Sequence, residues 1–166
     1  MIFENRTCFV IGAGGHCRVL LSILLEPSNQ HYEIIGILDL QTPKEKKEIF
    51  GIPVIGGVEK LESFSGESPD LFLSIGDNAT RKKYFELWKA QGFQFPNLIS
   101  EKAFISSKVN IGQGNVICPH AHIGPYVTIG DNNIINTRTT LEHESGVGDH
   151  CHIAPASLVC GRSQIG

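Results

Sequence analysis

The chain has 166 residues, of which 41% are hydrophobic, and carries 14 Lys and Arg against 17 Asp and Glu, so its formal net charge is −3. Such a composition is typical of a globular protein with one or two small domains. The basic residues are scattered along the sequence, and no apolar run approaches the roughly 20 residues that a membrane span needs. We therefore expect neither nucleic-acid binding nor a membrane span.

The start of the chain and the cysteines indicate a compartment. The sequence begins with no basic segment, no apolar stretch and no cleavage site, so we expect no signal peptide. The cysteines are odd in number and form no CxxC pair, which favours buried free thiols in a reducing cytoplasm. They are Cys8, Cys17, Cys118, Cys151 and Cys160. We therefore expect a cytoplasmic protein.

The first part of the chain alternates strand-like and helix-like segments. Apolar runs predict strands at 7–11, 33–38, 51–57 and 71–75. Apolar residues at helical spacing predict helices at about 15–26, 58–64 and 79–91, the last burying Tyr84, Phe85, Leu87 and Trp88. Strands that alternate with helices are typical of a small parallel sheet. We expect an α/β, Rossmann-like domain over residues 1–98.

A glycine-rich turn, Gly12 to His16, joins the first predicted strand to the first helix. A helix N-terminus offers unpaired N–H groups and a positive dipole end, and glycines let a phosphate approach them closely. The dinucleotide fingerprint GxGxxG requires a third glycine where this chain has Cys17, which disfavours NAD. A mononucleotide, a sugar nucleotide and a plain tight turn remain open.

Polar residues also end two of the later strands. Asp39 follows the second strand, where a partner for a ribose or a base would lie, although a polar residue can also simply close a strand. Gly76, Asp77 and Asn78 end a later strand. Because parallel strands end at the same edge of a sheet, these residues are expected to face the same crevice as the glycine-rich turn.

From Ile99 onward the sequence repeats every six residues. Twelve consecutive positions in this phase, from Ile99 to Ile165, are Ile, Leu or Val, and the residue two positions earlier is mostly small. A period of six fits neither a helix nor an alternating strand and is typical of a solenoid. Three hexapeptides close one triangular coil, which predicts a left-handed parallel β-helix over 99–166. The chain stops at Gly166, just after an Ile-Gly that would open another hexapeptide, so we expect a C-terminally truncated β-helix.

Histidines are dense in this repeat: His120, His122, His143, His150 and His152. Glu142 and Glu144 flank His143, and a carboxylate beside an imidazole suits a general base because it orients the ring. His143 and His152 are half a coil apart, so we expect them to meet only across a groove between two subunits of a trimer. The other three histidines are expected to be solvated turn residues.

Zinc held by three histidines between subunits, as in the β-helical carbonic anhydrases, is the second interpretation of these residues. The histidine pair that those enzymes use has a spacing that does not occur here, where successive histidines are 2, 21, 7 and 2 residues apart. We therefore expect no metal.

Over essentially its whole length the sequence resembles the bacterial sugar acetyltransferases of the PglD/NeuD type. The similar segments are IGAGGHCRV (11–19), Asp39, GIPVIGG (51–57), SIGDNATRKK (74–83), FPNLIS (95–100) and INTRTTLEHESGVGDHCHIAPAS (135–157). The resemblance implies an acetyl-CoA-dependent N- or O-acetyltransferase of surface glycan biosynthesis. Its acceptor would be a nucleotide-linked amino sugar or a sialic-acid-like sugar.

The resemblance also implies roles for individual residues. It makes His143 the general base, oriented by Glu144, in a direct attack on the thioester without an acyl-enzyme. It places acetyl-CoA, a co-substrate, against His152, Asn136 and Gly161 in a homotrimer whose active sites lie between subunits. It places the nucleotide sugar against Gly12, Gly14, Gly15, His16, Asp39, Gly76 and Asp77.

The sequence departs from the family pattern in two places. Family members often carry an acidic pair or triplet after the second strand, whereas here Leu40 and Gln41 follow Asp39. The nucleotide, UDP, GDP or dTDP, therefore stays open. Family members also continue for further coils that supply much of the coenzyme A groove. The alternative hypothesis is thus a non-catalytic nucleotide-sugar-binding paralogue.

Overall fold

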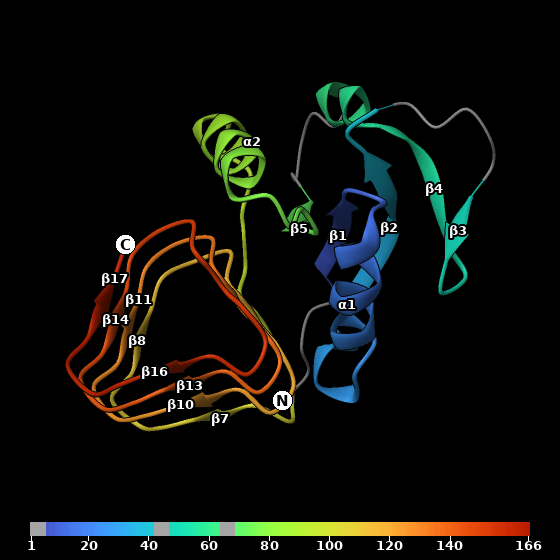
Figure 1. Ribbon diagram of the computed structural model, residues 1–166. Helices are drawn as coiled ribbons and strands as arrows, with labels where there is room; N and C mark the ends of the chain where they lie inside the picture. The colour runs from blue at the N-terminus through green and yellow to red at the C-terminus, as the bar shows by residue number, and fades with distance from the viewer. Residues whose placement is uncertain (1–5, 42–46, 64–68) are drawn as a thin grey trace. The chain divides into compact units, whose positions relative to one another are not determined.

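The computed structural model describes residues 6–41, 47–63 and 69–166 (Figure 1). Contacts within the chain divide it into two compact units, Met1–Pro96 and Asn97–Gly166. The division falls two residues before the boundary that the hexapeptide repeat alone indicates. Within the described ranges, no helix is both long enough and apolar enough to cross a membrane.

The first unit contains a five-stranded sheet in the order β3-β4-β2-β1-β5. Its strands are β1 (Arg6–Ile11), β2 (Tyr32–Asp39), β3 (Glu48–Ile49), β4 (Ile52–Gly57) and β5 (Asp70–Leu73). The helices are α1 (Gly15–Leu24), α2 (Asn78–Ala90) and two 3-10 helices, η1 (Pro27–Asn29) and η2 (Val58–Ser63). Four of the strands pair in parallel, so the predicted parallel α/β fold is confirmed.

The pairing of β3 with β4 was not predicted from the sequence. These two strands are antiparallel and are joined by Phe50 and Gly51, whose φ angles are 54° and 75°. Two successive positive φ angles are typical of a two-residue hairpin turn that matches the twist of the flanking strands. Strand β3 is only two residues long, too short to give an alternating pattern in the sequence.

Helix α2 begins at a polar cap and buries one face. The Asp77 carboxylate accepts a hydrogen bond from the Thr80 amide at 3.4 Å, as expected of an N-cap residue. Arg81, Phe85 and Trp88, spaced by four and three residues, are buried. The prediction that Leu87 belongs to this face is wrong, since it is 44% exposed. A helix turns about 100° per residue, which carries Leu87 away from the face that Arg81 and Phe85 define.

The second unit is the predicted left-handed parallel β-helix, built from twelve two-residue strands in three parallel four-stranded sheets (Figure 1). The strands are β6 (Leu98–Ile99), β7 (Phe104–Ile105), β8 (Asn110–Ile111), β9 (Val116–Ile117), β10 (His122–Ile123), β11 (Thr128–Ile129), β12 (Ile134–Ile135), β13 (Thr140–Leu141), β14 (Gly146–Val147), β15 (His152–Ile153), β16 (Leu158–Val159) and β17 (Gln164–Ile165). Each strand pairs with the strand one coil away, as His122 does with Thr140.

The repeated aliphatic residues form the core of this unit. Ile117, Ile135 and Leu141 are completely buried and belong to one continuous cluster. One residue of nearly every turn, at six-residue intervals from Lys108 to Arg162, has a φ between 56° and 74°. This left-handed conformation recurs at the same turn position, so residues 18 apart occupy equivalent places in successive coils.

A row of asparagines, of which Asn115 and Asn133 are buried, closes one corner of successive coils. The Asn97 Oδ1 accepts the Asn115 amide, the Asn115 Oδ1 accepts the Asn133 amide, and the Asn133 Oδ1 accepts the Cys151 amide, at 2.7 to 2.9 Å. These side chains satisfy backbone N–H groups that the turn would otherwise bury without partners. The small residues that the repeat places two positions before each aliphatic therefore also serve as hydrogen-bonding groups.

Shortening Ile135 to Val is expected to lower the free energy of unfolding of the β-helix by about 0.5–1.5 kcal/mol. The side chain is fully buried between Ile117 and Ile153 of the adjacent coils, so the lost methyl leaves a void. Urea unfolding followed by circular dichroism measures the effect. The matched change Ile165→Val, at a residue that is 38% exposed, should cost clearly less, and equal costs would contradict this account of the core.

Candidate active site

A cavity of about 440 Å³ opens at the carboxyl edge of the parallel sheet, where α1 and α2 begin. Its lining includes all seven residues predicted for the nucleotide sugar: Gly12, Gly14, Gly15, His16, Asp39, Gly76 and Asp77. Ala13, Leu40, Ser74, Ile75 and Thr80 complete it. The fold thus gathers three separate sequence segments around one hollow, and two helix N-termini border it.

Hydrogen bonds fix the strand ends that border this cavity. The Asp39 Oδ1 accepts the Leu40 amide at 2.8 Å and the Ala13 amide at 3.3 Å. The Ser74 hydroxyl lies 2.8 Å from the Ile11 carbonyl oxygen and 2.5 Å from that of Gly12. Asp39 therefore already holds the glycine-rich turn against the end of β2, and its second carboxylate oxygen leaves capacity to accept from a ligand.

The glycines of the turn are required for different reasons. Gly12 has a φ of 101°, a conformation that other residues rarely adopt. Gly14 is extended with a φ of −80°, and a Cβ on Gly14 or Gly15 would meet no protein atom within 4 Å. Neither the backbone nor the packing of the chain demands glycine at these two positions. Their missing side chains instead keep the N-terminus of α1 open to the cavity.

Arg81 supports the opposite wall, and sequence reasoning did not identify it. This residue is 1% exposed, and its Nη1 donates to the carbonyl oxygens of Ile75 and Gly76 at 3.1 and 3.2 Å. Its Nη2 donates to Asn78 Oδ1 at 2.9 Å. The guanidinium thus ties the loop after β5 to α2. Its position one helical turn after Asp77 was the only signal in the sequence.

In the β-helix, the turn between β13 and β14 carries His143 and Glu144. The His143 Nδ1 lies 3.0 Å from the Glu144 Oε2, and the two side chains are 53% and 46% exposed. A carboxylate can only accept a hydrogen bond, so Nδ1 donates and the lone pair of the neutral ring is on Nε2. The Nε2 atom is thus the nitrogen that could accept a proton, and the role of His143 as a general base stays a prediction.

The next coil places Gly161 and Arg162 over this pair. A Cβ on Gly161 would lie 2.7 Å from the His143 Nε2 and Cε1, so any other residue here would force the His143 ring to move. The Arg162 Nε donates to the Glu144 Oε2 at 3.2 Å. The hydrogen bond from His143, and then the hydrogen bond and charge of Arg162, hold the pKa of the Glu144 carboxyl below its usual value.

The remaining residues predicted for acetyl-CoA lie at another corner of the prism. The Asn136 Nδ2 and the His152 Nε2 are 2.9 Å apart, which joins the turn after β12 to β15. His143 belongs instead to the turn after β13, so within one chain it is at a different corner from His152, as the half-coil spacing predicts. Gly161 stacks on His143 and not on the Asn136–His152 pair.

The other histidines differ from their predicted role in one respect. His122 lies in β10 rather than in a turn, and its ring stacks on Phe104 with centroids 4.9 Å apart. His150 lies in a turn and its Nδ1 is 2.8 Å from the Asn132 Nδ2. Among the described residues, no three His, Cys, Asp or Glu side chains gather in a group that could hold a metal ion.

The five cysteines are free thiols. Burial raises the pKa of Cys8 to about 12 and that of Cys118 to about 11, so neither is a ready nucleophile. The expectation that all five thiols are buried is wrong for Cys160, which is exposed. Cys160 immediately precedes Gly161 in a turn, where the small-residue pattern does not enforce burial.

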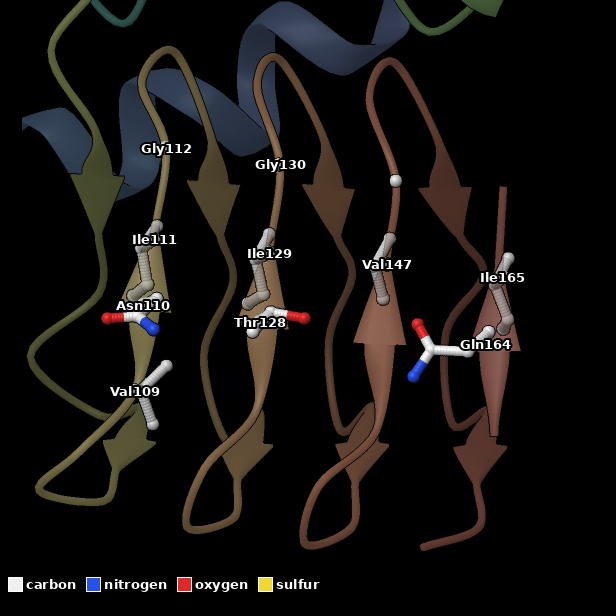
Figure 2. Close-up of a pocket in the computed structure, with 11 residues that line it drawn as sticks. Val109, Asn110, Ile111, Gly112, Thr128, Ile129, Gly130, Val147, Gln164 and Ile165 are labelled. Atoms are coloured by element: carbon white, nitrogen blue, oxygen red, sulfur yellow. The ribbon is translucent and has the colours of Figure 1, made fainter. Parts of the chain in front are cut away.

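A larger hollow of about 700 Å³ runs along the sheet of β8, β11, β14 and β17 (Figure 2). Its polar side chains are Asn110, Thr128 and Gln164, and the rest of its lining is Val, Ile and Gly. None of these groups titrates near neutral pH, and none of the predicted site residues lies there. This hollow therefore offers no acid or base of its own.

Comparisons with known proteins agree with this architecture. Residues 8–87 match the family model of the PglD N-terminal domain. The acetyltransferase domain of PglB from Neisseria gonorrhoeae is 32% identical, with a TM-score of 0.86 over 98% of this chain and 77% of that chain. The same domain has also been solved in complex with acetyl coenzyme A.

Two further relatives extend the comparison. A histidine-to-asparagine mutant of perosamine N-acetyltransferase from Caulobacter crescentus, in complex with CoA and GDP-perosamine, is 28% identical. Its TM-score is 0.86 over 99% of this chain and 76% of that chain. An uncharacterized protein of Acanthamoeba polyphaga mimivirus is 35% identical over 127 residues, and the chain spans about a quarter, 24%, of that protein's length. The PglB domain, together with the PglD family model and the perosamine N-acetyltransferase, shows that the chain belongs to the PglD/NeuD-type family of bacterial sugar acetyltransferases.

Proposed function

We propose that this chain transfers an acetyl group from acetyl-CoA to the amino group of a nucleotide-linked amino sugar. The observation that carries the proposal is the His143–Glu144 pair, whose imidazole Nε2 lies beside Gly161, a residue without a side chain. The cavity lined by the seven predicted residues supports a nucleotide-sugar site in the first unit. The relatives solved with acetyl coenzyme A and with GDP-perosamine support the same pair of substrates.

In the proposed reaction the sugar amine attacks the thioester carbonyl directly. The Nε2 of His143 takes the proton from the amine as the C–N bond forms, and Glu144 holds the ring through Nδ1. The tetrahedral intermediate then collapses, the C–S bond breaks, and the proton passes from His143 to the departing sulfur of CoA. A donor from the Asn136–His152 corner would stabilise the oxyanion. No metal takes part in this scheme.

The same scheme requires more than one copy of the chain. His143 and the Asn136–His152 pair lie at different corners, so a partner copy would bring the second corner to the first. The sheet between these corners exposes Phe104 and Leu158, which are 57% and 64% exposed, with His122 stacked on Phe104. Large exposed apolar side chains in one column are typical of an interface between subunits. We propose a homotrimer with active sites between subunits.

Release of free CoA from acetyl-CoA, measured with UDP-, GDP- and dTDP-linked 4-amino sugars, tests the function. Turnover with one sugar nucleotide would support the acetyltransferase and identify the nucleotide. Tight calorimetric binding of a sugar nucleotide without any CoA release would overturn the transferase and favour a nucleotide-sugar-binding protein. Light scattering of the same sample gives the number of copies.

A further inference from the structure

We propose that Arg162 is a positioning residue for the His143–Glu144 pair and sets the pH range in which this pair works. The inference rests on the proposed function, in which His143 is the base. It concerns a residue that the sequence analysis did not include in the site. Arg162 lies one coil beyond Glu144 and shares with it the same left-handed turn conformation, with φ angles of 64° and 57°.

The geometry centres on a single oxygen atom. The Oε2 of Glu144 accepts from the His143 Nδ1 at 3.0 Å and from the Arg162 Nε at 3.2 Å. All three side chains are partly or largely exposed, so a single hydrogen bond would hold the carboxylate weakly. Two donors that converge from different coils hold it more firmly than either could alone. The backbone is fixed as well, since the Arg162 amide donates to the His143 carbonyl oxygen at 3.1 Å.

The position is specific to this corner. The four residues equivalent to Arg162 in successive coils are Lys108, Tyr126, Glu144 and Arg162 itself, so Arg162 is the group that covers Glu144 from the next coil. The residue before it, Gly161, has no side chain and leaves the His143 ring in place. Gly161 thus lies against His143, where its small size leaves space for the ring. Arg162 lies against Glu144, where its charge pairs with the carboxylate.

The charge of Arg162 offsets part of the field of Glu144 at the imidazole. The carboxylate favours the protonated ring, and a base must be unprotonated to act. A guanidinium on the same oxygen weakens that preference while it keeps the carboxylate ionised and oriented. The low pKa of the Glu144 carboxyl, to which Arg162 contributes after His143, is consistent with this role.

Removing each charge should therefore shift the pH profile in opposite directions. In Arg162→Gln no guanidinium offsets the field of the Glu144 carboxylate at the imidazole. The acidic limb of the plot of kcat/KM against pH should therefore move to higher pH by a few tenths of a unit, as expected for an exposed pair. In Glu144→Gln the limb should move to lower pH. At a pH on the wild-type acidic limb, Arg162→Gln should be roughly 2- to 5-fold slower.

The experiment combines that profile with an NMR titration of the His143 ring, which needs no activity. Arg18→Gln is the control for loss of an arginine charge, because Arg18 is an exposed arginine on α1, outside the β-helix. Lys108 and Tyr126 share this turn position in the preceding coils, and Glu142 and Cys160 precede His143 and Gly161 in the chain. These four titratable residues are unchanged in every variant.

Opposite shifts of the His143 titration in Arg162→Gln and Glu144→Gln, with none in Arg18→Gln, would support the proposal. Identical His143 titrations in wild type and Arg162→Gln would overturn it, even if the enzyme is active. An inactive wild type whose titrations shift as expected would instead count against the proposed function alone.

Discussion

Replacing His143 by Gln is expected to lower kcat for acetyl transfer by about 10²- to 10⁴-fold, the usual contribution of general acid–base catalysis. The side chain is 53% exposed and packs in no core cluster, so the fold should survive the change. A glutamine amide retains a donor toward Glu144 and has no basic nitrogen. The loss should therefore appear in kcat, with little change in the dissociation constants of acetyl-CoA and the sugar nucleotide.

Free CoA release gives kcat, and calorimetry gives the dissociation constants of both substrates. The matched control is His120→Gln, at an exposed histidine in a turn of the same β-helix with a φ of 62°. This variant should retain wild-type kcat and thermal stability. A His143→Gln enzyme with more than about a tenth of the wild-type kcat would mean that another group accepts the proton.

The β-helix could be predicted from the sequence because each six-residue repeat forms one strand and one turn of the fold. A residue such as Leu141 must be aliphatic when every coil places it in the same buried column, and the repetition makes the pattern unmistakable. The residues around the cavity at the carboxyl edge of the sheet could be predicted as well. Gly14, Asp39 and Asp77 follow strands of one parallel sheet, so the topology brings them to one edge wherever the intervening loops run.

The sequence did not reveal side-chain contacts that no motif or hydrophobic periodicity marks. Arg162 reaches Glu144 only because 18 residues close one coil and both side chains leave the same turn position. Arg81 is buried by the loop it supports, and a lone arginine in a helix is usually solvated. His122 lies on a strand face beside Phe104, and because histidine is polar the hydrophobic periodicity does not predict this contact.

Replacing Gly15 by Leu is expected to weaken binding of the sugar nucleotide by roughly 10²- to 10⁴-fold. This residue begins α1 and lines the cavity, so a leucine side chain would occupy the space into which a phosphate would approach the helix N-terminus. Losing two hydrogen bonds to a charged group costs about 3–6 kcal/mol, which corresponds to an affinity loss of this size. Calorimetric titration with the best sugar nucleotide measures it.

The structure also predicts that this loss is separate from folding. A Cβ on Gly15 meets no protein atom within 4 Å, and a leucine favours the helix by roughly 0.5–1 kcal/mol over glycine. The thermal midpoint of Gly15→Leu should therefore equal or exceed that of wild type. Ser22→Leu, on the exposed side of the same helix, is the matched control and should bind normally. Unchanged affinity in Gly15→Leu would place the phosphates elsewhere, because a ligand at this helix N-terminus cannot tolerate the new side chain.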